Sequence, residues 1–177
     1  MNQSYSLGMN NHKPYSVWRD GWRSQRGEIY VAIQGLLFAW LIFGPKNWSP
    51  LGAWPLFAGT AATWTGITLI ALGFLIATSA ALGLGRALTP LPKPNEAGKL
   101  VASGVYRWVR HPIYTGVLLM ALGWAFYIEG LVTLWSVLLL AIFFDIKSRR
   151  EEQWLLERYP EYAAYREKTR RLIPFLY

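Results

Sequence analysis

The chain contains no cysteine among its 177 residues. That absence excludes disulfide bonds, thiolate metal sites and a cysteine nucleophile. Charged residues are also scarce, at 16% of the chain, whereas a soluble domain usually carries about a quarter. Because 53% of the residues are hydrophobic and they come in blocks, the composition is typical of a membrane protein. The first 27 residues are polar, so we do not expect them to act as a signal peptide.

Four apolar stretches predict membrane-spanning helices, at residues 29–43, 60–84, 113–128 and 131–146. A span needs about 20 apolar residues, so the second stretch is long enough to cross a bilayer and the other three are short. Only Glu129 and Gly130 separate the last two stretches, which predicts a tight antiparallel helical hairpin. We therefore expect an all-α polytopic membrane protein, with an N-terminal segment over residues 1–27 and a single membrane domain over residues 28–177.

The lysines and arginines are distributed unevenly between the loops. The N-terminal segment has four, the first loop one, the central loop five, the hairpin turn none and the C-terminal segment eight. The positive-inside rule then places both termini and the central loop in the cytoplasm, on one side of the cell's inner membrane. We expect the fourth helix to continue beyond the bilayer until Pro160 ends it, and a short helix to follow at 161–169.

Small residues recur along the second stretch at a spacing of seven: Gly59, Gly66, Gly73 and Ala80. That repeat keeps one stripe of small side chains facing a partner helix, and small residues let membrane helices approach closely. The pattern predicts a packing seam, with a binding groove as the alternative.

A polar cluster stands at the start of the third span, where Arg110, His111 and Tyr114 surround Pro112. Proline suits the first turn of a helix, where its missing N–H costs little. The partial positive charge of such a helix end would stabilise an anionic group of a ligand. The alternative is that these side chains only anchor the helix at the lipid headgroups.

A second ionisable pair, Glu151 and Glu152, follows the fourth span. Acidic residues near anionic headgroups are not obvious anchors, which favours a functional site. The alternative is a solvated helix that pairs its own charges, because Lys147 stands four residues before Glu151, and Asp145 four before Arg149.

Two blocks of residues carry a family resemblance. The first block is Lys99-Leu100-Val101-x-x-Gly104-x-Tyr106-x-x-x-Arg110-His111-Pro112-x-Tyr114. The second block is Glu151-Glu152, then Tyr159-Pro160-Glu161-Tyr162, Tyr165 and Arg171-Leu172-Ile173-Pro174. In order and spacing they resemble the isoprenylcysteine carboxyl methyltransferase family, over about half of the chain, from Leu100 to Pro174.

The resemblance implies an integral-membrane enzyme that transfers a methyl group from S-adenosylmethionine to a lipophilic acceptor. The acceptor would be an isoprenylcysteine-like carboxylate, a phospholipid amine or a small lipophilic molecule reaching the site from the lipid bilayer, with no nucleic acid and no metal involved. The cofactor region would comprise residues 85–112 and 147–177. The expected cofactor-binding residues are Lys99, Leu100, Val101, Gly104, Tyr106, Arg110, His111, Tyr114, Glu151 and Glu152, and the expected catalytic residues are Lys147 and Glu151.

The chain departs from the family pattern at two positions. Gly98 stands where the family usually has histidine, and Lys147 stands where it often has arginine. Lysine keeps the positive charge but lacks the pair of N–H donors with which arginine binds a carboxylate. Two other classes stay open: a membrane reductase that uses a nicotinamide cofactor, although no G-x-G-x-x-G unit occurs, and a membrane scaffold or transporter. A transporter is expected to carry an ionisable residue at mid-bilayer, whereas the strongly polar residue deep in a span here is the uncharged Gln34.

Overall fold

The computed structural model describes residues 27–51, 54–89, 91 and 99–174. In these ranges four long helices, α2 (Glu28–Phe43), α3 (Thr60–Leu84), α4 (Pro112–Tyr127) and α5 (Leu131–Arg158), precede the short α6 (Tyr162–Lys168). Single 3₁₀ turns occur at η1 (Ser49–Leu51), η2 (Gly85–Ala87) and η3 (Gly104–Arg107). Each long helix begins within one residue of the start of a predicted stretch. The four basic residues of the N-terminal segment lie outside the described residues.

Two of the long helices, α3 and α5, are long and apolar enough to cross a membrane, with 25 and 28 residues. The helices α2 and α4 are apolar but have 16 residues each. At about 1.5 Å per residue they extend about 24 Å, which is less than the roughly 30 Å of hydrocarbon in a bilayer. The chain therefore has the helices of a membrane protein, and the count of four spans stays a prediction.

Glycines bring α3 and α4 into close contact, as the seven-residue repeat predicted. A Cβ atom added to Gly66 would lie 2.7 Å from the carbonyl oxygen of Gly123, and one added to Gly116 would lie 2.5 Å from that of Gly73. The two backbones therefore touch where any side chain would separate them. These four glycines form the α3–α4 seam, so the prediction of a packing stripe is confirmed.

Gly59 does not belong to the α3–α4 seam. It precedes the first residue of α3 with a φ of +69°, so its backbone has already left the helix. Its N–H donates to Oε1 of Glu129 at 2.6 Å, which ties the start of α3 to the α4–α5 turn. The repeat therefore predicts the seam correctly from Gly66 onwards and fails where the helix begins.

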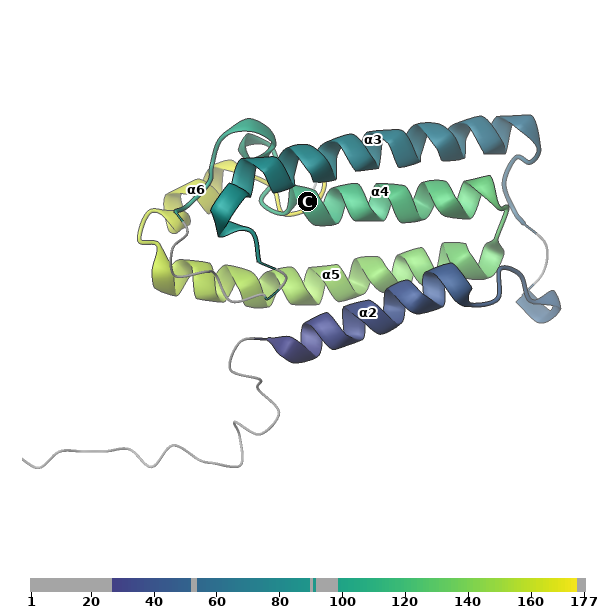
Figure 1. Cartoon of the computed structure of the whole chain (residues 1–177), viewed down its shortest axis with the longest axis horizontal. Coiled ribbons are helices and arrows are strands. Elements are labelled where there is room, and N and C mark those ends of the chain that lie inside the picture. Colours follow the sequence, from purple (N-terminus) through teal and green to yellow (C-terminus); the bar gives the residue numbers. More distant parts are fainter. Residues whose placement is uncertain (1–26, 52–53, 90, 92–98, 175–177) are drawn as a thin grey trace, which may run out of the picture.

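The C-terminal half of the chain is a helical hairpin against which α2 packs. Ile128, Glu129 and Gly130 connect α4 to α5, and α5 continues past its apolar part to Arg158, two residues before Pro160. Figure 1 shows α2 alongside α5, on the side away from α3. Ring contacts join Tyr30 to Phe143 and Phe38 to Phe144, with centroids 6.4 Å apart in both pairs.

The polar parts of the molecule gather at one end of the helices. The start of α2, the end of α3, the start of α4 and the last turns of α5 lie at this end with α6 (Figure 1). This arrangement agrees with the charge distribution, which placed the termini and the central loop on one side. That this side is the cytoplasm stays a prediction.

Candidate active site

A cavity of about 450 Å³ opens at the polar end of the helices. Pockets that bind small molecules usually enclose about 300–1,000 Å³, so the size suits a nucleotide-sized ligand. Its walls come from α2, residues 84–89 and 91, residues 99–106, the start of α4, the charged part of α5, and α6. The polar and aromatic lining residues are Gln34, Thr89, Lys99, Tyr106, Arg110, His111, Tyr114, Lys147, Glu151, Tyr159, Tyr162 and Tyr165.

His111 lies between the two glutamates. Its Nδ1 is 3.4 Å from Oε2 of Glu151, and its Nε2 is 3.3 Å from Oε1 of Glu152. Only the protonated imidazolium has a hydrogen to donate from both nitrogens. Burial lowers the pKa of His111, but the hydrogen bonds and charges of Glu151 and Glu152 raise it more, so its pKa lies above the ordinary 6.5. The ring also stacks on Tyr114, with an interplanar angle of 3°.

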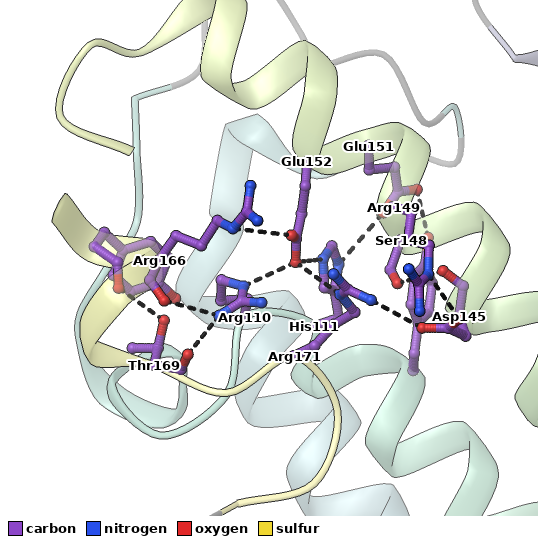
Figure 2. Close-up of polar contacts among 12 residues, drawn as sticks. Arg110, His111, Asp145, Ser148, Arg149, Glu151, Glu152, Arg166, Thr169 and Arg171 are labelled. Carbon is purple, nitrogen blue, oxygen red and sulfur yellow. Dashed lines mark hydrogen bonds and ion pairs between the residues drawn. The ribbon is translucent and has the colours of Figure 1, made fainter. Parts of the chain in front are cut away.

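Glu152 is the centre of a buried ion cluster, as Figure 2 shows. Its Oε1 is 2.8 Å from Nε of Arg110 and 3.3 Å from Nε of Arg171. Arg166 approaches its other oxygen at 3.9 Å. With 2% of its surface exposed, Glu152 does not line the cavity, and we assign it to holding the surrounding elements together.

Arg110 lines the cavity but donates to protein groups. Besides Glu152, it donates to the carbonyl oxygen of Arg166 at 3.1 Å and to that of Thr169. The backbone follows the same course, since the N–H of Arg110 donates to the carbonyl of Arg170 at 2.8 Å. The start of α4 is thereby fastened to the segment after α6.

Further hydrogen bonds complete this attachment. The N–H of His111 donates to the carbonyl of Arg171 at 3.1 Å, and Oγ1 of Thr115 donates to that of Leu172 at 2.6 Å. Arg171 also bonds Asp145 at 2.9 Å. The Arg171-Leu172 part of the second sequence block therefore closes the site from behind, where it supports the residues that face the cavity.

Glu151 faces the cavity, and 14% of its side chain is exposed. The hydroxyl of Tyr114 donates to its Oε1 at 2.5 Å. Lys147, one turn earlier on α5, places Nζ 3.9 Å from the same oxygen. Nζ of Lys147 donates its hydrogen bond instead to Oε1 of Gln34 on α2, at 2.6 Å. The other expected helix pair, Asp145 with Arg149, forms at 2.8 Å.

Tyrosines form another part of the wall. Tyr165 donates to the carbonyl of Tyr106 at 2.6 Å, and Tyr106 donates to that of Ala80 at 3.3 Å. The hydroxyl of Tyr162 is buried and has no hydrogen-bond partner among the residues that the structure describes. Burial is the largest of the causes that raise the pKa of Tyr106 and Tyr162 above the ordinary 10, and it raises that of Tyr165 to about 12. The phenols are therefore neutral at pH 7.

The structure brings most of the expected site residues to one cavity: Lys99, Leu100, Val101, Tyr106, Arg110, His111, Tyr114, Lys147 and Glu151. Glu152 lies behind it. Gly104 is exposed at the start of η3, where its φ of +60° suits glycine, and it is absent from the lining. Gly98 lies outside the described residues.

Sequence reasoning missed several lining residues. Tyr159, Tyr162 and Tyr165 line the cavity. They belong to the second sequence block, and this membership could have identified them as site residues. Gln34 was visible as a lone polar residue in an apolar stretch, but its partner on α5 was not. In the part of the chain that the structure describes, no cluster of three or more His, Asp or Glu side chains is arranged to hold a metal ion.

Comparison with known families gives a match to phospholipid methyltransferase over residues 61–162. Among curated relatives, the cobalt-zinc-cadmium resistance protein CzcN of Cupriavidus metallidurans is 31% identical over 84% of this chain and 63% of its own length. A probable protein-S-isoprenylcysteine O-methyltransferase of Oryza sativa is 30% identical, over 64% of this chain and 62% of its own length. The protein-S-isoprenylcysteine O-methyltransferase of Schizosaccharomyces pombe is 34% identical, over 60% of this chain and 49% of its own length.

A solved structure shares the fold. It is the eukaryotic intramembrane Ras methyltransferase ICMT, or isoprenylcysteine carboxyl methyltransferase. The alignment has a TM-score of 0.59 and 23% identity, and it covers 93% of this chain and 58% of the other. The chain thus spans about six-tenths of the length of the first relatives, at 63% and 62%. The family match over residues 61–162 shows that this chain belongs to the phospholipid methyltransferase family; its relatives include isoprenylcysteine methyltransferases, and it shares the fold of ICMT.

Proposed function

We propose that this protein is an integral-membrane methyltransferase that transfers a methyl group from S-adenosylmethionine to a lipophilic acceptor. The observation that carries the proposal is the position of Glu151, a carboxylate that faces a cavity built from both sequence blocks. Family membership supports the reaction type and does not favour the nicotinamide-dependent reductase or the scaffold.

The lining residues fit S-adenosylmethionine. Glu151 offers a partially exposed carboxylate for the ammonium group or the ribose hydroxyls of the cofactor. Lys99 offers a cation for its carboxylate, and apolar residues such as Leu100 and Leu155 offer surface for the adenine ring. The part that we assign to Arg110 and His111 is indirect, because they donate to Glu152 and Glu151 and so fix where the carboxylates point.

S-adenosylmethionine supplies a methyl group that its positively charged sulfur activates. The sulfur departs as a neutral thioether, so the leaving group needs no acid. The residues of the chain mainly align the reactants, which must approach within about 3–3.5 Å, and exclude water. A carboxylate acceptor needs no base. An amine acceptor must lose a proton, and for such an acceptor Glu151 would serve as the base instead of holding the ammonium group of the cofactor.

The acceptor enters from the bilayer in this proposal. Val31, Leu84 and Ile113 belong to helices of the membrane part and line the cavity, which gives it an apolar side. We propose an isoprenylcysteine-like carboxylate, a phospholipid amine or a small lipophilic molecule as the acceptor. Lys147 is a buried cation suited to an anionic head group.

Calorimetry with S-adenosylhomocysteine in detergent tests the cofactor site. Glu151→Gln keeps the shape and removes the charge, so we expect affinity to fall about ten- to a hundred-fold, the effect of losing a charge-assisted hydrogen bond worth about 1.5–3 kcal/mol. Glu157→Gln is the matched control, because Glu157 is exposed on the same helix. Equal binding by the wild-type protein and both variants would count against the site. No binding by the wild-type protein would count against the function.

A further inference from the structure

One polar side chain of α2 reaches the cavity. Gln34 lies on the face of α2 that packs against α5, one turn after Tyr30 and one turn before Phe38, whose rings contact α5. Residue 34 precedes the segment matched by the family, which begins at residue 61. A polar group among apolar helices is costly unless it is hydrogen-bonded, and Gln34 is bonded to Lys147.

The position of Lys147 shows a competition between two acceptors. Its ammonium group is almost fully buried, with 2% of the residue exposed. The neutral Oε1 of Gln34 lies 2.6 Å away, and the charged Oε1 of Glu151 lies 3.9 Å away. A charge-assisted hydrogen bond from lysine to a carboxylate normally measures about 2.7–2.9 Å. Lys147 and Glu151 are four residues apart on a helix, which allows such contact, yet the lysine is bonded to Gln34.

We propose that Gln34 is a positioning residue that holds Lys147 away from Glu151, so that this carboxylate stays available to the methyl donor. The inference rests on the proposed function. Glu151 already accepts a hydrogen bond from Tyr114 on Oε1, and Nδ1 of His111 lies 3.4 Å from its Oε2. A full-strength bond from Lys147 would add a second cation beside this carboxylate, and the ammonium group of the donor would then meet an occupied acceptor.

Removing the amide should release the lysine. In Gln34→Leu, Lys147 loses its 2.6 Å partner and is expected to close on Glu151. Affinity for S-adenosylhomocysteine should then fall about tenfold, which corresponds to about 1.4 kcal/mol. Adding Lys147→Met to this variant removes the competitor, so affinity should return to within about twofold of the wild-type value. If Gln34 only supports packing, the second substitution, Lys147→Met, is not expected to restore the affinity.

Two further variants complete the experiment, which is calorimetry in detergent. Gln34→Glu keeps an acceptor for Lys147 and should bind S-adenosylhomocysteine like the wild type. Gly35→Ala, at a position on α2 with no atom within 4 Å of the added Cβ, should do the same. Unchanged affinity in Gln34→Leu, or lost affinity that Lys147→Met does not restore, would overturn the inference while the function stands. Absence of binding by the wild type would overturn both.

Discussion

At the scale of single residues, the adjacent glutamates have different environments. Glu151 faces the cavity with 14% of its side chain exposed, whereas Glu152 is held by Arg110, His111 and Arg171. Successive residues on a helix are rotated by about 100°, so an acidic pair cannot present both carboxylates in one direction. One therefore suits a ligand and the other suits the cluster behind it.

Two tyrosines of α6 test the hydrogen bonds of the cavity wall. Tyr165→Phe removes the bond to the carbonyl of Tyr106 and should lower the free energy of unfolding by about 0.5–1.5 kcal/mol. Tyr162→Phe removes a buried hydroxyl without a partner among the described residues, so the ligand-free protein should lose no stability. Thermal unfolding in detergent measures both. A larger loss for Tyr162→Phe than for Tyr165→Phe would contradict the structure.

His111 predicts a pH dependence of stability. Its pKa in the folded protein lies above 6.5 because of the two glutamates, despite burial. The contribution of the charged ring is therefore complete below about pH 6.5 and is lost as pH rises through the higher folded value. The difference in melting temperature between wild type and His111→Asn should shrink from pH 6 to pH 9. A difference that grows with pH would mean that the ring is neutral in the folded protein.

At the scale of elements, the α3–α4 seam fixes the frame of the site. The seam brings the backbones together at Gly66 with Gly123 and at Gly73 with Gly116. The end of α3 is then held near η3, where Tyr106 bonds Ala80. Since α4 begins at the ion cluster, a change in the spacing of the two helices should be transmitted to the cavity.

Substitution in the seam should be costly. A Cβ added to Gly123 would lie 2.6 Å from the carbonyl oxygen of Gly66 and 2.8 Å from the backbone nitrogen of Ile70. Because backbone cannot move aside as a side chain does, Gly123→Ala should destabilise the protein by about 1–3 kcal/mol, as overpacking usually does. Gly35→Ala, in open space, should gain up to about 1 kcal/mol from helix propensity. Equal melting temperatures of the two variants in detergent would exclude a tight seam.

At the scale of the whole molecule, the site depends on all of the polar ends lying on one side of the membrane. Figure 1 places the start of α2, the end of α3, the start of α4 and α6 at one end. The lysine and arginine counts of four, one, five, none and eight along the chain predict that this side is the cytoplasm. A cytoplasmic cofactor and a lipophilic acceptor would then meet at the cavity from opposite directions.

Reporter fusions test this topology. A reporter joined after residue 50 should lie outside the cytoplasm, and reporters after residues 95 and 177 should lie inside it, because positive loops stay cytoplasmic. Enzymatic reporters active on only one side of the membrane give the measurement. An external signal at residue 95 or 177 would reverse the predicted orientation and remove access to cytoplasmic S-adenosylmethionine.

Local information in the sequence determined the helices and much of the site. Apolar runs bounded by proline and glycine placed α2 to α5 within one residue at their starts. The two sequence blocks named most of the residues that line the cavity. Both signals are local, since periodicity and capping act within a few turns of helix, and the family pattern is read along the chain.

Only the tertiary structure decided which polar groups meet. Gln34 and Lys147 are 113 residues apart in sequence, and their contact arises from the packing of α2 on α5. The donors of Arg110 were expected to face a ligand, but Glu152 on α5, a carbonyl oxygen within α6 and that of Thr169 accept them. Charge alone could not choose between these partners, because a buried donor binds whichever acceptor the packed helices bring within about 3 Å.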